Sequence, residues 1–167
     1  MGAQMKQKDL LVLSHLRQNA RIPLTILSKK TSIPVSTIFD RLRIYEEARI
    51  IRHTSLLNFD KLGYGVRASI SLKVDHQDKE ALHDFLKAHA SVNSAYRISN
   101  GFDYLVEAVF EQIKDLDSFL DSIEKKFRVK EKQSYFIIDD VKREAFLTNE
   151  HLLPFPENPS LFWPEPI

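Results

Sequence analysis

The segment from residue 35 to residue 48 (VSTIFDRLRIYEEA) has the clearest potential for chemistry, because its pattern is that of an amphipathic helix. Ile38, Leu42 and Tyr45 follow the three- and four-residue spacing of a buried stripe. The remaining positions carry hydroxyl, aromatic, carboxylate and guanidinium groups on Ser36, Thr37, Phe39, Asp40, Arg41 and Arg43. Such groups bind base edges and phosphates in the major groove of DNA. The segment therefore predicts a recognition helix, in which Arg43 reaches a guanine edge or a phosphate.

Further basic residues near this helix could contact phosphates: Arg21, Lys29, Lys30, Arg49 and Arg52. From Met1 to Leu62 there are 11 lysine or arginine residues against 5 acidic residues, a net charge of +6, and the rest of the chain carries −5. This asymmetry predicts that the N-terminal third meets a polyanion. Charge alone does not separate nucleic acid from an acidic protein surface, so a winged-helix module that binds protein stays open as an alternative.

A second group of candidate residues surrounds an Asn-Gly pair, which is a strong hairpin-turn signal. A carboxylate beside such a turn could bind the ammonium group of an amino acid, while backbone amides bind its carboxylate. We therefore predict an effector site at Asn100, Gly101, Phe102 and Asp103, with Ser134 as an outlying member. The alternative is that the pair is only a turn and that Asp103 pairs with a neighbouring subunit.

Catalytic chemistry finds little support in the sequence. His76, His83 and His89 lack the four-residue spacing of a helical metal pair, and Asp139 and Asp140 would point to opposite faces of a strand. There are no cysteines, and the four glycines form no phosphate-binding loop. We expect a protein that is not an enzyme and uses no metal or cofactor. A catalytic sheet domain is the enzyme-class alternative, and it would need a titratable cluster that the sequence does not supply.

The apolar stretches are too short for a membrane span, which takes roughly 18 or more consecutive apolar residues. The N-terminal residues MGAQMKQKD lack the apolar core of a signal peptide. We expect a cytoplasmic protein with no membrane partner.

The N-terminal residues predict three short helices, over residues 9–18, 24–30 and 35–48. Asp9 is placed to act as an N-cap or first-turn acid. A break at 31–34 separates the last two helices, as in a helix-turn-helix. Residues 50–58 predict a strand or small wing.

The following residues alternate between strand and helix patterns. Strands are predicted at 66–74, 92–99, 103–110 and 130–139, and helices at 78–89 and 114–127. The helix at 78–89 would turn Ala81, Leu82, Phe85 and Leu86 inward. The order β-α-β-β-α-β predicts a ferredoxin-like antiparallel sheet with two helices on one face, so the whole chain is of the α+β class. We expect an apolar open face of that sheet to be covered by a second copy, which predicts a homodimer.

These patterns divide the chain into a winged helix-turn-helix domain with a linker strand (1–62), a ferredoxin-like domain (63–142) and a C-terminal arm (143–167). Five of the seven prolines fall within 146–167. Such a density of proline prevents regular structure, so we expect an extended arm that lies on its own domain or on a neighbouring subunit.

The sequence resembles the leucine-responsive and asparagine-regulator (Lrp/AsnC, or feast/famine) family of archaeal and bacterial transcription regulators. Residues 9–42, which include Asn19-Ala20-Arg21, are similar to the family's first helices. Leu62-Gly63 is similar to the family's domain junction, and the β-α-β-β-α-β order with the hairpin residues 101–104 (GFDY) resembles its assembly and effector domain. The resemblance covers about residues 9–142. It implies a homodimer that often assembles into octamers, binds double-stranded DNA near promoters and, in many members, responds to an amino acid held between dimers.

The sequence departs from the family pattern at several positions. Pro34 replaces the usual serine cap of the recognition helix, Tyr45 the usual leucine and Arg49 the usual glycine after that helix. The turn at Asn100-Gly101 differs from the family's usual glycine, two residues and aspartate, which bears on effector binding more than on fold. A regulator that organises DNA without an effector therefore stays open beside the effector-responsive one.

Overall fold

The computed structural model describes residues 7–99 and 101–153, which fall into two compact units. The helical unit comprises Met1–Ser55 and Lys142–Ile167, and the sheet unit comprises Leu56–Val141. The first boundary thus lies a few residues before the expected one at 62/63, and the C-terminal segment belongs with the N-terminal helices. Within the described residues, no helix is long and apolar enough to cross a membrane.

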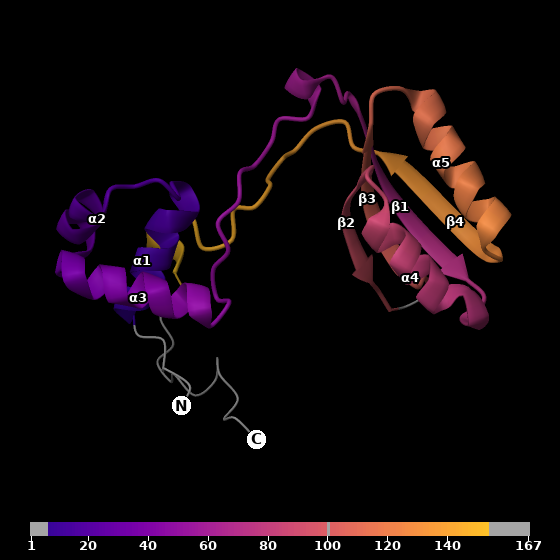
Figure 1. Ribbon diagram of the computed structural model, residues 1–167. Helices are drawn as coiled ribbons and strands as arrows, with labels where there is room; N and C mark the ends of the chain where they lie inside the picture. The colour runs from indigo at the N-terminus through magenta and orange to yellow at the C-terminus, as the bar shows by residue number, and fades with distance from the viewer. Residues whose placement is uncertain (1–6, 100, 154–167) are drawn as a thin grey trace. The chain divides into compact units, whose positions relative to one another are not determined.

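The helical unit contains the three predicted helices, α1 (Gln7–Gln18), α2 (Leu24–Thr31) and α3 (Val35–Glu47) (Figure 1). Their apolar stripes meet in one core, whose buried members are Val12, Leu13, Leu27, Ile33, Ile38 and Tyr45. The turn between α2 and α3 is tight because Ser32 adopts a left-handed conformation (φ 54°). The Ser28 hydroxyl donates to the Ile33 carbonyl across this turn (2.6 Å). The helix-turn-helix prediction is confirmed.

Residues 51–58 form no strand within the chain, so the strand expected at 50–58 is wrong for the single chain. The amides of Ile50 and Ile51 both donate to the Tyr45 carbonyl (2.8 and 3.3 Å), which holds the start of this segment against the end of α3. A strand also needs a neighbouring backbone to complete its hydrogen bonds, and no other strand of the described residues pairs with this segment.

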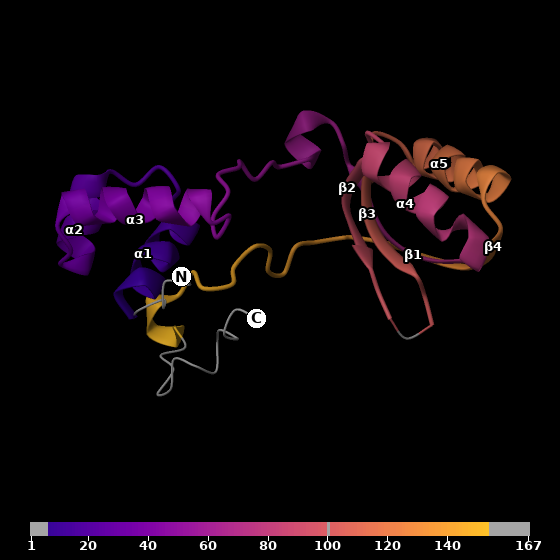
Figure 2. The same ribbon diagram turned by 60° about the horizontal axis from the view of Figure 1, so that its bottom comes forward.

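The sheet unit has four strands, β1 (Val66–Val74), β2 (Val92–Arg97), β3 (Tyr104–Phe110) and β4 (Val129–Phe136), and two helices, α4 (Lys79–Ala88) and α5 (Ile113–Lys126). The strand order is β2-β3-β1-β4 with every pair antiparallel, which confirms the ferredoxin-like prediction. Both helices lie on the same face of the sheet (Figure 1 and Figure 2). Short 3-10 helices occur at Asp60–Leu62 and His76–Asp78, and a third lies in the helical unit at Glu150–Leu152.

The core of the sheet unit follows from the period-2 alternation of β1. Ala68, Ile70, Leu72 and Val74 are buried beneath the two helices, against residues such as Leu86. One detail of the prediction is wrong, since Ala81 is exposed. The buried stripe of α4 is centred on Leu82 and Leu86, so position 81 lies at its edge.

The opposite face of the sheet is mixed in character, whereas we expected an uncovered apolar face. The strand register sets Ser69 between Glu107 and Tyr135, and the same face carries Arg67. The Arg67 guanidinium forms ion pairs with Glu107 (3.2 Å) and Asp140 (2.8 Å). The apolar side of β1 is the side that the helices cover, so the reason given for a dimer was wrong, and the dimer itself stays a prediction.

The C-terminal segment lies on the chain's own α1, which is one of the two alternatives foreseen for the arm. The Arg17 guanidinium donates to the Phe146 carbonyl (3.2 Å), and the Gln18 side-chain amide donates to the Thr148 carbonyl (2.6 Å). Leu153 is buried. Most of the predicted proline-rich arm, from 154 to 167, lies outside the described residues.

Candidate nucleic-acid interface and ligand pocket

The outward face of α3 presents the predicted DNA-contacting groups. Ser36, Asp40 and Arg43 are exposed, Thr37 is half-buried and the Phe39 ring is 58% exposed. The only ion pair recorded for Arg43 among the described residues is with Glu47, at 3.8 Å and with both side chains mostly in solvent. Exposed pairs of this kind contribute little, about 0–1 kcal/mol, so the Arg43 guanidinium can exchange Glu47 for a base or a phosphate.

Arg41 is directed differently from the rest of the predicted set. Its guanidinium bonds to the Asp9 carboxylate, and the Tyr45 hydroxyl donates to the same oxygen at 2.6 Å. Only a quarter of the Arg41 side chain is exposed. Asp9 lies in the first turn of α1, as predicted, but its side chain joins α1 to α3. The Arg41 guanidinium thus links α3 to α1 within the chain, and its predicted contact with DNA stays a prediction.

The hydroxyl of Tyr45, at the position where the resemblance leads us to expect a leucine, has a partner inside the fold. The residue is buried, and its hydroxyl is satisfied by Asp9. Burial raises the pKa of the phenol well above its ordinary value, and the hydrogen bond to Asp9 raises this pKa further. The phenol therefore stays protonated and keeps donating to Asp9 at any ordinary pH.

Both ends of α3 show the consequences of the departures seen in the sequence. Pro34, at the N-cap, makes no side-chain hydrogen bond, so the first amides of α3 remain available to solvent or to a phosphate. Arg49 adopts a left-handed conformation (φ 55°) two residues after the last residue of α3. Glycine tolerates that conformation best, and any other residue there costs about 1–2 kcal/mol.

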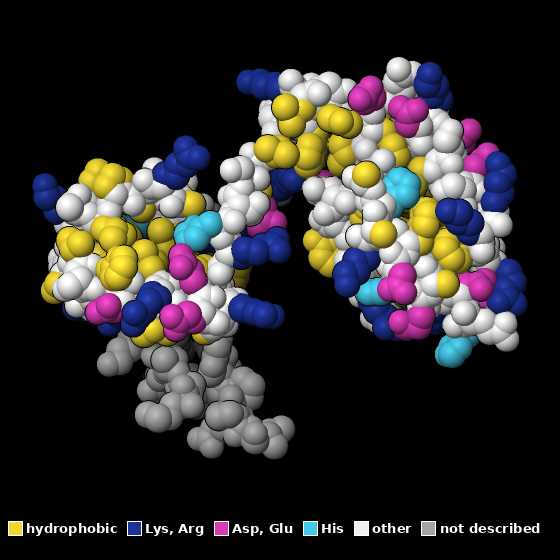
Figure 3. Space-filling view, viewed as in Figure 1, with side chains coloured by type: hydrophobic (Ala, Val, Ile, Leu, Met, Phe, Trp, Pro, Cys, Tyr) yellow, Lys and Arg dark blue, Asp and Glu magenta, His cyan; other side chains and the backbone are white. Residues whose placement is uncertain are grey.

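The predicted phosphate contacts are all exposed and come from three places in the helical unit. Arg21 precedes α2, Lys29 and Lys30 lie in its last turn, and Arg49 and Arg52 follow α3. Figure 3 shows Lys and Arg side chains, interspersed with Asp and Glu, around the rim of the visible face of this unit, with hydrophobic side chains at its centre. Exposed basic side chains on either side of a helix suit the phosphate backbones that flank a groove.

The predicted effector residues are only partly brought together. Gly101 has a positive φ (106°), as the turn requires, Phe102 is half-buried, and Asn100 lies outside the described residues. Ser134 is exposed on β4, and β1 separates that strand from β3. Ser134 therefore does not adjoin the hairpin within one chain.

Asp103 is already neutralised within its own chain. The Lys79 ammonium lies 2.5 Å from one carboxylate oxygen, and the Val74 amide donates to the other at 3.0 Å. Burial alone would raise the pKa of Asp103, but the bonds to Lys79 and Val74 outweigh it, and the pKa lies below its ordinary value. Within one chain this carboxylate already holds Lys79, so a ligand's ammonium group would have to share or replace that ion pair. The predicted contact with a ligand and the alternative pair with a neighbouring subunit both stay predictions.

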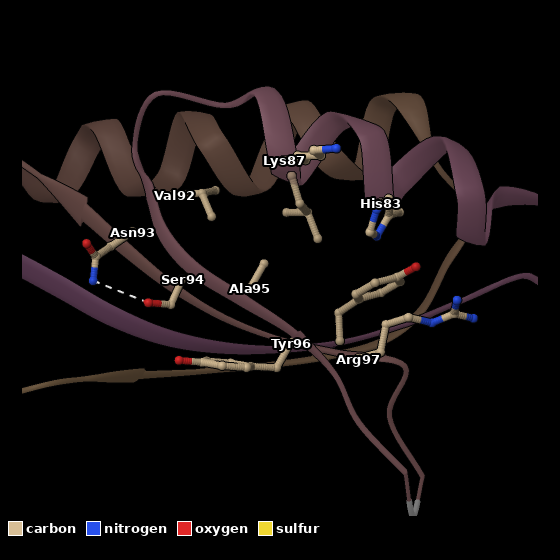
Figure 4. Close-up of a pocket in the computed structure, with 10 residues that line it drawn as sticks. His83, Lys87, Val92, Asn93, Ser94, Ala95, Tyr96 and Arg97 are labelled. Atoms are coloured by element: carbon tan, nitrogen blue, oxygen red, sulfur yellow. Dashed lines mark hydrogen bonds between the residues drawn. The ribbon is translucent and has the colours of Figure 1, made fainter. Parts of the chain in front are cut away.

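A pocket of about 270 Å³ lies elsewhere in the sheet unit, between α4 and the edge strand β2 (Figure 4). His83 and Lys87 line it from α4, and Ser94 and Arg97 line it from β2. Tyr104 forms part of its wall, with its hydroxyl donating to the Lys79 carbonyl (2.9 Å). No pattern in the sequence indicated this pocket, because its residues come from separate elements and share no motif or spacing.

The comparisons with known proteins agree with the fold and with the exposed helix. A family model for a winged helix-turn-helix DNA-binding domain matches residues 5–52, and the model for the Lrp/AsnC ligand binding domain matches residues 67–146. These two matches follow each other along the chain and correspond to the helices and to the sheet. Together they define a DNA-binding transcription regulator. The chain belongs to the Lrp/AsnC family, which confirms the resemblance seen in its sequence.

Individual relatives span most of the chain. An HTH-type transcriptional regulator of Pyrococcus furiosus is 26% identical over 137 residues, which cover 81% of this chain and 93% of that protein. The glutamate uptake regulatory protein of Zymomonas mobilis is 22% identical over 153 residues, covering 89% and 90%. The solved structure of a transcriptional regulator from Neisseria meningitidis in complex with L-Met has a TM-score of 0.76 at 24% identity, covering 81% and 91%.

Proposed function

We propose that this regulator binds duplex DNA as a homodimer, with α3 of each copy in the major groove, and that a small ligand of the sheet unit changes this binding. The proposal rests on one observation above all: α3 buries Ile38 and Tyr45 and turns Ser36, Asp40 and Arg43 outward. In a helix-turn-helix the second helix reads the bases in this way. We assign no catalytic role to the chain.

Contacts with phosphates complete the proposed interface. Arg21, Lys29, Lys30, Arg49 and Arg52 would each neutralise a phosphate, and each such contact steepens the log–log dependence of affinity on salt by about 0.9. The net charge of +6 from Met1 to Leu62 favours this interface over one with a basic partner.

The sheet unit is the proposed site of self-association and of ligand binding. Its open face carries large exposed rings at Tyr96 and Tyr135, which are 57% and 60% exposed, and aromatic groups of this kind are enriched at interfaces. The names of two relatives refer to glutamate uptake and to a complex with L-Met. They support a ligand of the amino-acid class or a close chemical relative. The resemblance extends the proposed assembly from dimers to octamers.

The proposal is tested by selecting bound sequences from a random duplex library and then measuring affinity for the selected site over a range of salt. Arg43→Ala should weaken binding by about 1–3 kcal/mol, roughly 5- to 150-fold, and relax the preference at one position of the site. The matched control is Lys114→Ala, which removes the same charge from an exposed position of α5. It should change affinity less than twofold. Salt-independent binding, or equal losses in the two variants, would show that α3 does not read DNA.

A further inference from the structure

The geometry points to a ligand class for the pocket between α4 and β2: a small organic anion with an apolar body, of the 2-oxo-acid type, in preference to a zwitterionic amino acid. This inference deepens the proposed function, because it names the ligand to which the regulator would respond. The pocket is distinct from the hairpin at Gly101, and the residues that line it include neither Gly101 nor Asp103.

The wall of the pocket suits a compact apolar group. Leu86 and Tyr104 are almost fully buried (1% and 2% exposed), and Val92 and Ala95 add further apolar surface. A volume of about 270 Å³ lies just under the roughly 300–1,000 Å³ of pockets that hold drug-sized ligands. The space therefore fits a metabolite with a short branched side chain.

The cationic side chains that line the pocket are Lys87, from α4, and Arg97, from β2 (Figure 4). The His83 imidazole lines it from α4 as well. The lining residues include no aspartate or glutamate. A carboxylate ligand would gain a charge-assisted contact with Lys87 or Arg97, and such contacts are about twice as strong as neutral ones.

The lining offers an ammonium group no carboxylate, only neutral acceptors such as the Asn93 and Ser94 side chains. The Asp103 carboxylate is held by Lys79 at 2.5 Å, and Glu80 lies 3.6 Å from the Arg97 guanidinium, with both of those side chains mostly in solvent. A zwitterion would therefore place its positive group among lysine and arginine without a carboxylate to balance it. Specificity then comes from the unfavourable contact as much as from the favourable one. A keto group in place of the amine removes the conflict.

The test uses the full-length protein and calorimetric titration with two ligands that share a carbon skeleton, 4-methyl-2-oxopentanoate and L-leucine. The oxo acid should bind at least tenfold more tightly than L-leucine. Lys87→Gln and Arg97→Gln should each weaken binding of the oxo acid, by roughly 5- to 10-fold, as expected for the loss of one partly exposed charge-assisted contact. The control Lys114→Gln, on exposed α5, should leave it unchanged within twofold.

A second measurement locates the bound ligand. Hydrogen exchange of the amides at 92–97 should slow in the presence of the oxo acid, because the ligand would join the edge strand β2 to α4. Tighter binding of L-leucine, binding that ignores both substitutions, or the absence of any binding would overturn the inference. Affinity for DNA is measured on the same protein without ligand, so intact DNA binding with no oxo-acid binding refutes this inference alone, and lost DNA binding refutes the proposed function.

Discussion

Replacing Asp9 with alanine removes an acceptor that two side chains of α3 share. The Tyr45 hydroxyl and the Arg41 guanidinium both donate to the same oxygen of Asp9, across 36 and 32 residues of sequence. Tyr45 is buried, whereas a quarter of the Arg41 side chain is exposed. The two donors should therefore respond differently when the acceptor is lost.

The expected cost follows from this difference. A buried hydroxyl without a partner costs about 1–3 kcal/mol. Arg41 can turn to solvent, so its lost ion pair adds only about 0–1 kcal/mol. We expect Asp9→Ala to destabilise the helical unit by about 2 kcal/mol, which corresponds to a thirtyfold larger opening constant.

Native-state hydrogen exchange followed by mass spectrometry measures this cost in the full-length protein, because peptides from α1–α3 report on the helical unit and peptides from β1–β4 serve as an internal reference. The same substitution in a Tyr45→Phe background should cost less than about 1 kcal/mol, since phenylalanine leaves no hydroxyl unsatisfied. Asp40→Ala is the matched control on the exposed face of α3 and should stay within about 0.5 kcal/mol.

Two results would refute the reasoning. An equal cost of Asp9→Ala in both backgrounds would show that the Tyr45 hydroxyl does not depend on Asp9. A cost of Asp40→Ala as large as that of Asp9→Ala would show that general helix effects, and not the buried contact, set the stability.

Three further predictions concern the helical unit. Arg49→Gly should stabilise it by about 1 kcal/mol in the same exchange assay, because glycine relieves the positive φ, and a loss of stability would contradict this. The raised pKa of Tyr45 means that the unfolded chain ionises first, so stability should fall as the pH rises above about 10, and Tyr45→Phe should flatten this dependence. Arg17→Ala should speed tryptic cleavage after Arg143 at least threefold, because the variant loses the hydrogen bonds from Arg17 to the Phe146 and Glu144 carbonyls and the C-terminal segment detaches from α1 more often. An unchanged cleavage rate would show that other contacts hold this segment.

Local patterns carried much of the prediction. The alternation over 66–74 gave the strand and its buried face, and the stripe of Ile38, Leu42 and Tyr45 gave α3 and its outward face. Both depend only on how a residue's position along one element sets the direction of its side chain. The same reasoning failed at 50–58, because strand formation also needs a partner backbone that no local pattern supplies.

Partners distant in the sequence decided the roles of individual charges. Arg41 and Arg43 both read as DNA contacts, yet Arg41 turns inward to Asp9 while Arg43 stays in solvent. Asp103 read as a ligand contact, yet it holds Lys79. The residues next to a charged side chain in the sequence do not indicate which distant group it will contact. Only the packed structure therefore shows which charges are already paired.

The sequence by itself determined the two kinds of domain, their order and the helix that faces outward, because burial imposes a period on each element. The tertiary structure alone decided that residues 142–153 return to α1, and that a basic pocket forms between α4 and β2. Arg17 and Phe146 are 129 residues apart, and the groups around the pocket come from different elements. Such contacts depend on how folded helices and strands pack against each other. That packing produces no periodic pattern in the amino-acid sequence.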